Sequence, residues 1–382
     1  MITVGSDPRV LVVGHDARPD GLPRMPGYVA FSEAADVLAS AAGADMASLR
    51  ISPTAPSMRV RRIVGRRYRR ATGRGRPLPA LPGDERSATA DAPLAHRYDL
   101  LVFVAVTEWD LPLLERLHDL RRRANRVAVW FPEVWPRDFD DRRLALEPFA
   151  MVDDLYVGVA DSAPLLTGVA GQPATYLPMA VDAVRFAPDS LDNPRPVDVL
   201  GIGRRLPGLH AALLDWSRRT GRYYVYDTVD GGEVLHPRAH RQNLASLYRR
   251  SNVAVTHYAK FDQPERIGDQ REIPGRVWEG LAGGTVMAGM PPSEQLQQHR
   301  PGMPVVEPLP HTPADAVAML DEICRRPNGH IRRRNLHLAL TANDWGHRWA
   351  TVFERAGLPV PSGLRARLDH LAERAEALDR AV

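Results

Sequence analysis

Short runs of consecutive apolar residues alternate with amphipathic segments along this chain of 382 residues. Residues 9–14 read RVLVVG and residues 99–106 read DLLVFVAV, so each run is apolar at neighbouring positions rather than at every second one. Strands of this kind are buried on both faces, which is typical of parallel sheets covered by helices. The alternation therefore predicts an α/β chain built from doubly wound parallel sheets.

The strand and helix pattern occurs twice, on either side of a proline-rich connector. A chain of this length is too long for one ordinary core and favours two domains. We expect a first Rossmann-like domain at residues 1–178, a linker at residues 179–196 and a second Rossmann-like domain at residues 197–340. Further strands of the first domain are predicted at residues 126–131, 154–158 and 174–177, and its helices at residues 32–42, 111–124 and 162–170. In the second domain, strands are predicted at residues 197–201, 223–226, 253–256, 285–288 and 305–307, and helices at residues 208–220, 241–250 and 313–326.

The segment IPGRVWEGLAGGTVMAGM, residues 273–290, predicts a further helix and strand with polar groups placed for a ligand. Pro274 favours a first helical turn, and the pair Gly283 and Gly284 is typical of a helix end. Arg276 and Glu279 are three residues apart, so they lie on one side of that helix. A carboxylate accepts hydrogen bonds from ribose hydroxyls, and a guanidinium binds phosphate oxygens. The alternative is an ordinary helix and strand unit with a solvated Arg and Glu pair.

Composition indicates a folded protein without a membrane span. Hydrophobic residues make up 44% of the chain and charged residues 25%, as in globular proteins. No apolar run approaches the roughly 20 residues that span a bilayer, and the amino terminus lacks a signal-peptide pattern, so we expect a cytoplasmic protein. Cys324, the single cysteine, allows neither a disulfide framework nor a cysteine-rich metal site, and we expect it in the core.

Arginines are concentrated in residues 58–76, MRVRRIVGRRYRRATGRGR, which contain no acidic residue. Residues 59–93 are therefore predicted to be an exposed, arginine-rich excursion. The segment from Arg59 to Arg76 could contact the anionic inner face of a membrane peripherally, contact a phosphorylated acceptor, or bind nucleic acid. The alternative is a solvated loop. Nucleic acid is not expected as a partner, because Tyr68 is the only aromatic residue among these arginines.

Four blocks of sequence together resemble a known class of enzyme. They are YLPMAVDAVRFAP at residues 176–188, GIGRR at 201–205, RVWEGLAGG at 276–284 and NDWGHRW at 343–349. In this order they are similar to the interdomain signature, the glycine and arginine turn, the donor-binding helix and the carboxy-terminal helix of GT-B nucleotide-sugar glycosyltransferases. The chain most resembles the retaining class and the spore-coat-maturation-like glycosyltransferases. The resemblance implies two Rossmann-like domains facing a central cleft, with residues 341–382 forming helices that cross back to the first domain.

The resemblance also implies roles for matching residues of the second domain. Glu279 corresponds to the glutamate that holds the donor ribose, and Arg204 or Arg205 to the arginine on the donor diphosphate. The two glycines after the helix, with the next residue, correspond to the turn beside the diphosphate. Lys260 lies in a loop that usually faces the transferred sugar, which makes it a catalytic candidate as well. The donor-binding candidates are Gly203, Arg204, Arg205, Lys260, Glu272, Arg276, Glu279, Gly283, Gly284 and Thr285.

Two positions depart from the family pattern. The family often has another glutamate eight residues before the one at Glu279, but this chain has Arg271 there and Glu272 one residue later. On a loop the shifted carboxylate could still reach the same place, whereas on a helix it would be turned by about 100°. The lysine that usually follows the glycine and arginine turn is also absent, and Arg205 or His210 could replace its charge.

The first domain is expected to bind the acceptor, which is a hydroxyl or amine of a small natural product, a glycan or a lipid-linked sugar. The acceptor-binding candidates after predicted strands are His15, Trp109 and Trp135. The candidate bases for an inverting reaction are Asp16, Glu108 and Glu133. A helix cap or a loop hydrogen bond is the alternative role of such carboxylates. A retaining enzyme needs no base, because the leaving diphosphate assists the incoming hydroxyl.

The predicted function is metal-independent, retaining transfer of a sugar from a nucleotide sugar, with no cofactor. Enzymes of the family stabilise the leaving diphosphate with cationic side chains and helix amino termini, and the histidines at 236, 240, 257 and 299 show no metal-ligand spacing. Two alternatives are an inverting enzyme and a catalytically inactive protein that binds a nucleotide or sugar. A nicotinamide-dependent oxidoreductase is disfavoured, since Gly14 is not part of a glycine fingerprint.

Overall fold

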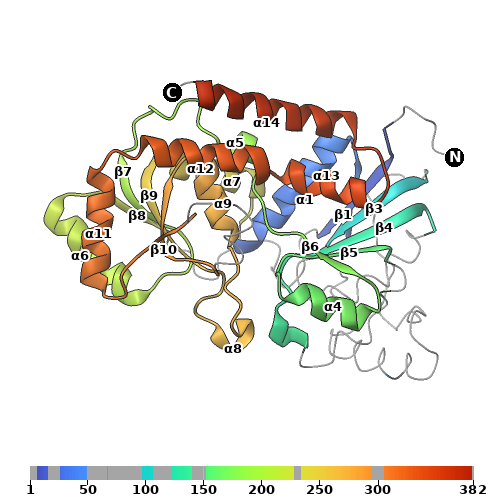
Figure 1. Ribbon diagram of the computed structural model, residues 1–382, viewed down its shortest axis with the longest axis horizontal. Coiled ribbons are helices and arrows are strands. Elements are labelled where there is room, and N and C mark those ends of the chain that lie inside the picture. The colour runs from blue at the N-terminus through green and yellow to red at the C-terminus, as the bar shows by residue number, and fades with distance from the viewer. Residues whose placement is uncertain are drawn as a thin grey trace. The chain divides into compact units, whose positions relative to one another are not determined.

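The chain divides into two compact units, each with its own parallel sheet flanked by helices (Figure 1). The computed structural model describes residues 7–15, 26–49, 67, 97–105, 122–139, 149, 152–227, 234–293 and 305–380. Unit 1 comprises Met1–Pro178, Glu265–Gly268 and Arg348–Arg367, and unit 2 comprises Met179–Pro264, Asp269–His347 and Leu368–Val382. The predicted α/β class is confirmed. The arginine-rich excursion at 59–93 lies outside the described residues, apart from Arg67.

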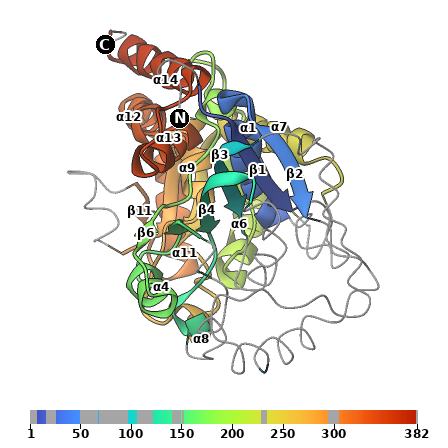
Figure 2. The same cartoon turned by 90° about the vertical axis from the view of Figure 1, so that its right-hand side faces the viewer.

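Six parallel strands form the sheet of unit 1, in the order β2-β1-β3-β4-β5-β6. These strands are β1 (Val10–His15), β2 (Asp45–Leu49), β3 (Tyr98–Val104), β4 (Ala124–Phe131), β5 (Asp154–Val157) and β6 (Ala174–Tyr176). Figure 2 shows β2, β1 and β3 as neighbouring ribbons. The sequence did not predict β2, because DMASL mixes polar and apolar residues instead of forming a continuous apolar run. The helix predicted at 111–124 is wrong at its end, since Ala124 already starts β4, and residues 106–121 lie outside the described residues.

Helices from both ends of the sequence pack in unit 1. Its elements besides the sheet are η2 (Pro26–Tyr28), α1 (Val29–Ala42), η4 (Pro136–Phe139), α4 (Ser162–Ala170), most of α8 (Pro264–Ile267) and of α13 (Trp345–Arg355), and the start of α14 (Ser362–Arg380). The indole Nε1 of Trp349 in α13 donates to the carbonyl of Ala34 in α1 at 3.0 Å. The same indole meets the ring of Trp130 edge to face, with ring centroids 6.0 Å apart. Residues 348–367 thereby belong to unit 1, with Trp349 buried in its core.

Five parallel strands form the sheet of unit 2, in the order β11-β10-β9-β7-β8. They are β7 (Val197–Gly201), β8 (Tyr224–Tyr226), β9 (Ser251–His257), β10 (Val286–Met290) and β11 (Glu307–Pro308). The helices are α5 (Ala183–Phe186), α6 (Pro207–Thr220), α7 (Pro237–Arg249), α9 (Gly275–Ala282), α11 (Pro313–Arg325) and α12 (Gly329–Ala342). The chain runs from β7 to β8 on one side and then places β9 on the other side of β7. Ligands of open α/β sheets bind where the strand order reverses in this way, at the carboxyl ends of the strands.

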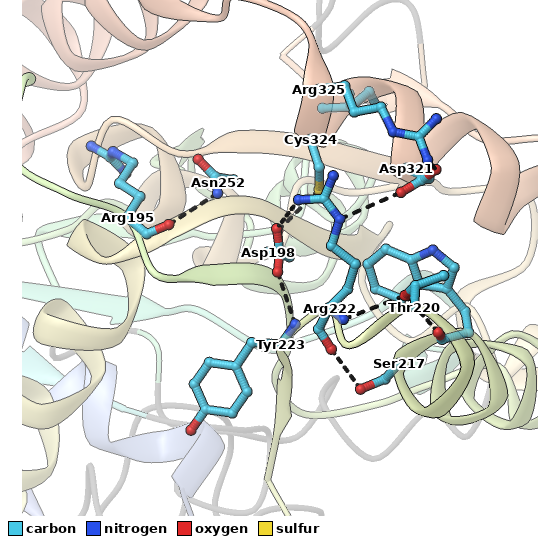
Figure 3. A network of polar contacts seen from close by, with 12 residues as sticks. Arg195, Asp198, Ser217, Thr220, Arg222, Tyr223, Asn252, Asp321, Cys324 and Arg325 are labelled. Carbon is cyan, nitrogen blue, oxygen red and sulfur yellow. Dashed lines mark hydrogen bonds and ion pairs between the residues drawn. The ribbon is translucent and has the colours of Figure 1, made fainter.

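A polar network fixes the opposite, amino-terminal edge of this sheet (Figure 3). Asp198, in β7, accepts from Arg222 at 2.7 Å and from the backbone N–H of Tyr223 at 2.8 Å. The guanidinium of Arg222 also lies 3.7 Å from the carboxylate of Asp321 in α11. Cys324 donates its thiol to the carbonyl of Asp198, and burial raises the pKa of the thiol to about 12. The cysteine therefore belongs to the structural end of unit 2.

No helix within the described ranges is long and apolar enough to cross a bilayer.

Candidate functional site

Polar residues gather where β7, β9 and β10 of unit 2 end. These strands end at Gly201, His257 and Met290, and parallel strands bring these ends to one edge of the sheet. The chain continues from β7 into the loop 202–206, and from β9 into the loop that leads to α9. This carboxyl edge contains most of the donor-binding candidates that the sequence supplies.

Gly203 forms a turn in the loop after β7. Its φ of 76° lies in the left-handed region, and its N–H donates to both carboxylate oxygens of Asp227, at 3.0 and 2.9 Å. Arg205 pairs with the same carboxylate and donates to the Asp227 carbonyl at 2.7 Å. Asp227 thus holds the loop after β7 to the end of β8.

Arg276, in the first turn of α9, lies directly against this loop. Its Nη1 donates to the carbonyl of Ile202 at 2.7 Å, and a Cβ added to Gly203 would lie only 2.4 Å from its Nη2. Glycine at 203 is therefore required for the guanidinium to lie there. The residue before the helix, Pro274, accepts the N–H of Val277 through its carbonyl at 3.0 Å but supplies no side-chain cap for the first two N–H groups of α9. A helix amino terminus with an adjacent guanidinium attracts an anion.

Glu279, one turn further along α9, is buried and paired with Arg241 of α7. The two residues are 6% and 3% exposed, and Arg241 Nη1 donates to Glu279 Oε1. The guanidinium also lies over the ring of Phe186, 4.7 Å from its centroid. Arg276 and Glu279 lie on one helix, as predicted, but they contact different partners.

The two candidates in the loop after β9 differ in exposure and conformation. Arg204 reaches this loop and forms an exposed ion pair with Asp262 at 2.6 Å. Lys260 has a φ of 53°, which makes it the one non-glycine residue of the described part with a positive φ. Non-glycine residues in this region are strained and are enriched at functional sites.

Glu272 turns inward and is 4% exposed. Its carboxylate accepts from the backbone N–H of Ile273 at 3.0 Å and from the amide of Gln270 at 3.3 Å. Arg271, at the position where the family often has glutamate, is exposed, and its guanidinium lies 5.5 Å from the centroid of the Tyr258 ring. The carboxylate that is shifted by one residue lies on a loop rather than on a helix.

The structure contradicts the expected role of Gly283, Gly284 and Thr285 beside the diphosphate. All three lie after the end of α9, at the amino end of β10. Arg195, which precedes β7, donates to the carbonyl of Gly283 at 2.9 Å, and Thr285 donates its hydroxyl to the Tyr248 carbonyl at 2.7 Å. Helix α9 carries the chain away from the carboxyl edge, so these three residues stabilise the opposite edge.

The candidates of the first domain are only partly described. His15 is the last residue of β1, whereas Asp16, Glu108 and Trp109 lie outside the described residues. Glu133 is half-buried in the turn after β4. Trp135, predicted to bind the acceptor, is instead packed in the core of unit 1 and is only 2% exposed.

Three polar residues at the carboxyl edge were not assigned a role from the sequence: Asp227, Arg241 and His257. Asp227 and His257 directly follow or end strands, which is a signal that could have identified them. Arg241 lies on the buried face of α7, and only its pairing with Glu279 indicates a role. Among the described residues, no group of three His, Cys, Asp or Glu side chains is arranged to hold a metal ion.

Neither a protein-family model nor a curated protein sequence matches the chain. Several solved structures are similar over nearly its whole length. The trehalose-6-phosphate synthase OtsA has a TM-score of 0.55 at 14% identity, and the match covers 92% of this chain and 100% of that one. A UDP-forming trehalose-phosphate synthase from Burkholderia xenovorans has a TM-score of 0.51 at 11% identity, covering 92% and 99%. Anabaena HepE, solved with UDP and glucose, has a TM-score of 0.50 at 9% identity, covering 92% and 99%. The chain therefore has the GT-B fold. At 9–14% identity, the likeness shows the fold alone.

Proposed function

We propose that this protein is a glycosyltransferase that moves a sugar from a nucleoside diphosphate sugar to a hydroxyl or amine acceptor. The observation that carries the proposal is the position of Arg276, between the Gly203 turn and the uncapped start of α9 at the carboxyl edge of unit 2. The similar structures add support, since they include a UDP-forming synthase and a protein solved in complex with UDP and glucose.

The diphosphate of the donor would bind at the start of α9. The partial positive charge of a helix amino terminus and the guanidinium of Arg276 both favour a group with negative charge. These interactions strengthen as charge develops on the leaving diphosphate, so they would lower the barrier as well as bind the donor. No metal ion is required for this stabilisation.

The ribose of the donor would bind to Glu279. Arg241 takes one oxygen of this carboxylate and fixes its orientation, while the second oxygen has lone pairs for a ribose hydroxyl. The pair thus supports a site that distinguishes ribonucleotides from deoxyribonucleotides.

The transfer step would follow the retaining course. The bond between the anomeric carbon and the diphosphate oxygen breaks, the acceptor oxygen bonds to that carbon on the same face, and the acceptor proton passes to the leaving diphosphate. Lys260 is the candidate residue beside the sugar, and its strained backbone supports a functional role. In an inverting enzyme, Glu133, Glu108 or Asp16 would take the proton instead.

Nucleotide binding tests the donor site. Titration calorimetry with UDP, GDP, ADP and TDP should identify a diphosphate that binds, and Arg276→Met should weaken that binding at least about tenfold, the loss of a hydrogen bond to a charged group. The matched control is Arg219→Met, because Arg219 forms an exposed ion pair with Asp215 on α6. Equal binding by both variants and the wild type would contradict the assignment.

Turnover distinguishes the enzyme from its second candidate, an inactive nucleotide-binding protein. This candidate is supported by Glu272, whose carboxylate bonds to its own loop instead of extending from it. Release of the nucleoside diphosphate from a matching nucleotide sugar supports the transferase, and tight binding without release supports the inactive protein. The anomeric configuration of the product, read by NMR, decides between retention and inversion.

A further inference from the structure

His257 ends β9 at the carboxyl edge of unit 2 and is 4% exposed. Its Nδ1 accepts the backbone N–H of Met290 at 3.3 Å, so this nitrogen carries no proton. The neutral ring must then carry its proton on Nε2. Burial, with a smaller contribution from the charge of Arg276, lowers the pKa of His257 to about 4, so the ring is neutral at physiological pH.

The Nε2–H of His257 has no hydrogen-bond partner among the described residues. A buried donor without a partner costs free energy, so such groups in native proteins are usually explained by a ligand or a bound water. Phe261 covers part of the ring, with centroids 4.5 Å apart and planes tilted by 59°. The surrounding structure therefore fixes the imidazole through Nδ1 and one neighbour ring but does not satisfy Nε2.

The surroundings of His257 favour an anion as the missing partner. His257 ends β9, the strand next to β7, and the guanidinium of Arg276 lies against the loop after β7. This guanidinium and the start of α9, which has no side-chain cap, lie together at this edge. Both contribute positive potential, and a neutral N–H adds a directional donor to it. A hydroxyl or a water would accept the same proton, but it would not use the positive potential.

We propose that His257 is a further donor-binding residue, whose Nε2–H donates a hydrogen bond to an oxygen of the diphosphate group held at Arg276. The assignment rests on the proposed function. His257 donates as a neutral group, so it neither adds charge nor transfers a proton. Its role is to orient the diphosphate relative to the sugar, because its own orientation is fixed by Met290.

Two substitutions test the roles of the two ring nitrogens of His257 separately. His257→Asn keeps an oxygen near the Nδ1 position to accept from Met290 and removes the Nε2–H, whereas His257→Gln places an amide N–H near the Nε2 position. The matched control is Thr256→Val. Thr256 is also buried, at 1% exposure, and its hydroxyl also has no partner among the described residues, but it points to the other face of the sheet.

Titration calorimetry with UDP, UMP and uridine, or with the matching series of whichever base binds, measures the effect. We expect His257→Asn to weaken diphosphate binding by about tenfold or more, with little change for the nucleoside, and His257→Gln to recover part of the loss. Thr256→Val should bind as the wild type does. The proposal is overturned if His257→Asn binds the diphosphate as tightly as the wild type, or if it weakens diphosphate and nucleoside equally.

A measurement on the unaltered protein guards against a variant that does not fold. In protein with ¹⁵N-labelled histidine, the Nε2 proton of His257 should shift downfield and exchange more slowly with water when UDP is added. An unchanged resonance with UDP bound contradicts this inference alone. A wild type that binds none of the four nucleoside diphosphates contradicts the proposed function, and this inference with it.

Discussion

Replacing Arg241 with methionine tests how unit 2 holds the carboxylate of Glu279. The two side chains are 3% and 8% exposed, and the guanidinium lies 4.7 Å from the Phe186 ring centroid. Methionine keeps much of the apolar volume but leaves a buried carboxylate without its cation. Breaking a buried pair in this way costs about 3–5 kcal/mol. We expect Arg241→Met to lower the free energy of unfolding of unit 2 by that amount.

The assay must report on unit 2, because two units need not unfold together. Hydrogen exchange with mass spectrometry, over peptides that contain α7 and α9, gives the local unfolding free energy. Arg219→Met is the control. It breaks a pair whose side chains are 64% and 63% exposed, which is expected to cost less than about 1 kcal/mol.

A double variant, Arg241→Met with Glu279→Met, separates the lost pair from the buried charge. Its stability should recover most of the loss, because a well-packed apolar pair can replace a buried ion pair. The reasoning is refuted if Arg241→Met costs no more than Arg219→Met, or if the double variant is no more stable than the single one.

Three further predictions concern burial and backbone conformation. Gly289→Ala should destabilise unit 2 by about 1–3 kcal/mol in urea unfolding, because an added Cβ would lie 1.5 Å from the Thr256 carbonyl oxygen, whereas Gly168→Ala, with nothing within 4 Å, should be neutral or stabilising. Cys324 should react much more slowly with a thiolate-specific reagent in the folded protein than in urea, since its folded pKa is about 12; equal rates would contradict its burial. His257 titrates near pH 4 when folded and near 6.5 when unfolded, so protonation favours the unfolded chain. As the pH is lowered from about 6.5 to about 4, the free energy of unfolding should decrease by up to about 1.4 kcal/mol per pH unit because of this residue. His257→Asn should flatten this dependence.

The sequence predicted the strands that are buried on both faces and missed the edge strand β2. Residues 100–106, LLVFVAV, are apolar at consecutive positions, and the structure has β3 there. In β7, VDVLG, only Asp198 interrupts the apolar residues. The edge strand β2 has residues such as Asp45 and Met46 exposed, so no apolar pattern distinguishes it from a loop. The apolar pattern reflects the burial of side chains, and fewer side chains are buried in an edge strand.

Only part of the candidate site could be predicted, because the deciding partners are distant in sequence. Helical spacing placed Arg276 and Glu279 on one side of α9, but it could not show that Glu279 pairs with Arg241, 38 residues earlier. Proximity in sequence also misled. Gly283 follows Glu279 closely, yet an eight-residue helix covers about 12 Å and carries it to the other edge of the sheet.

The absent lysine after the glycine and arginine turn has no substitute at its own loop. Arg205 is tied to Asp227, and the Nδ1 of His210 lies 2.9 Å from the Tyr224 hydroxyl. Burial lowers the pKa of His210, which leaves it neutral at physiological pH. The positive charge at the carboxyl edge therefore comes from Arg276 and the start of α9, together with Arg204, which is paired with Asp262, and Lys260 in the loop after β9. In the proposed donor site a fixed N–H donor would add to this charge, since an oriented neutral donor stabilises a developing negative charge without the desolvation cost of a further cation.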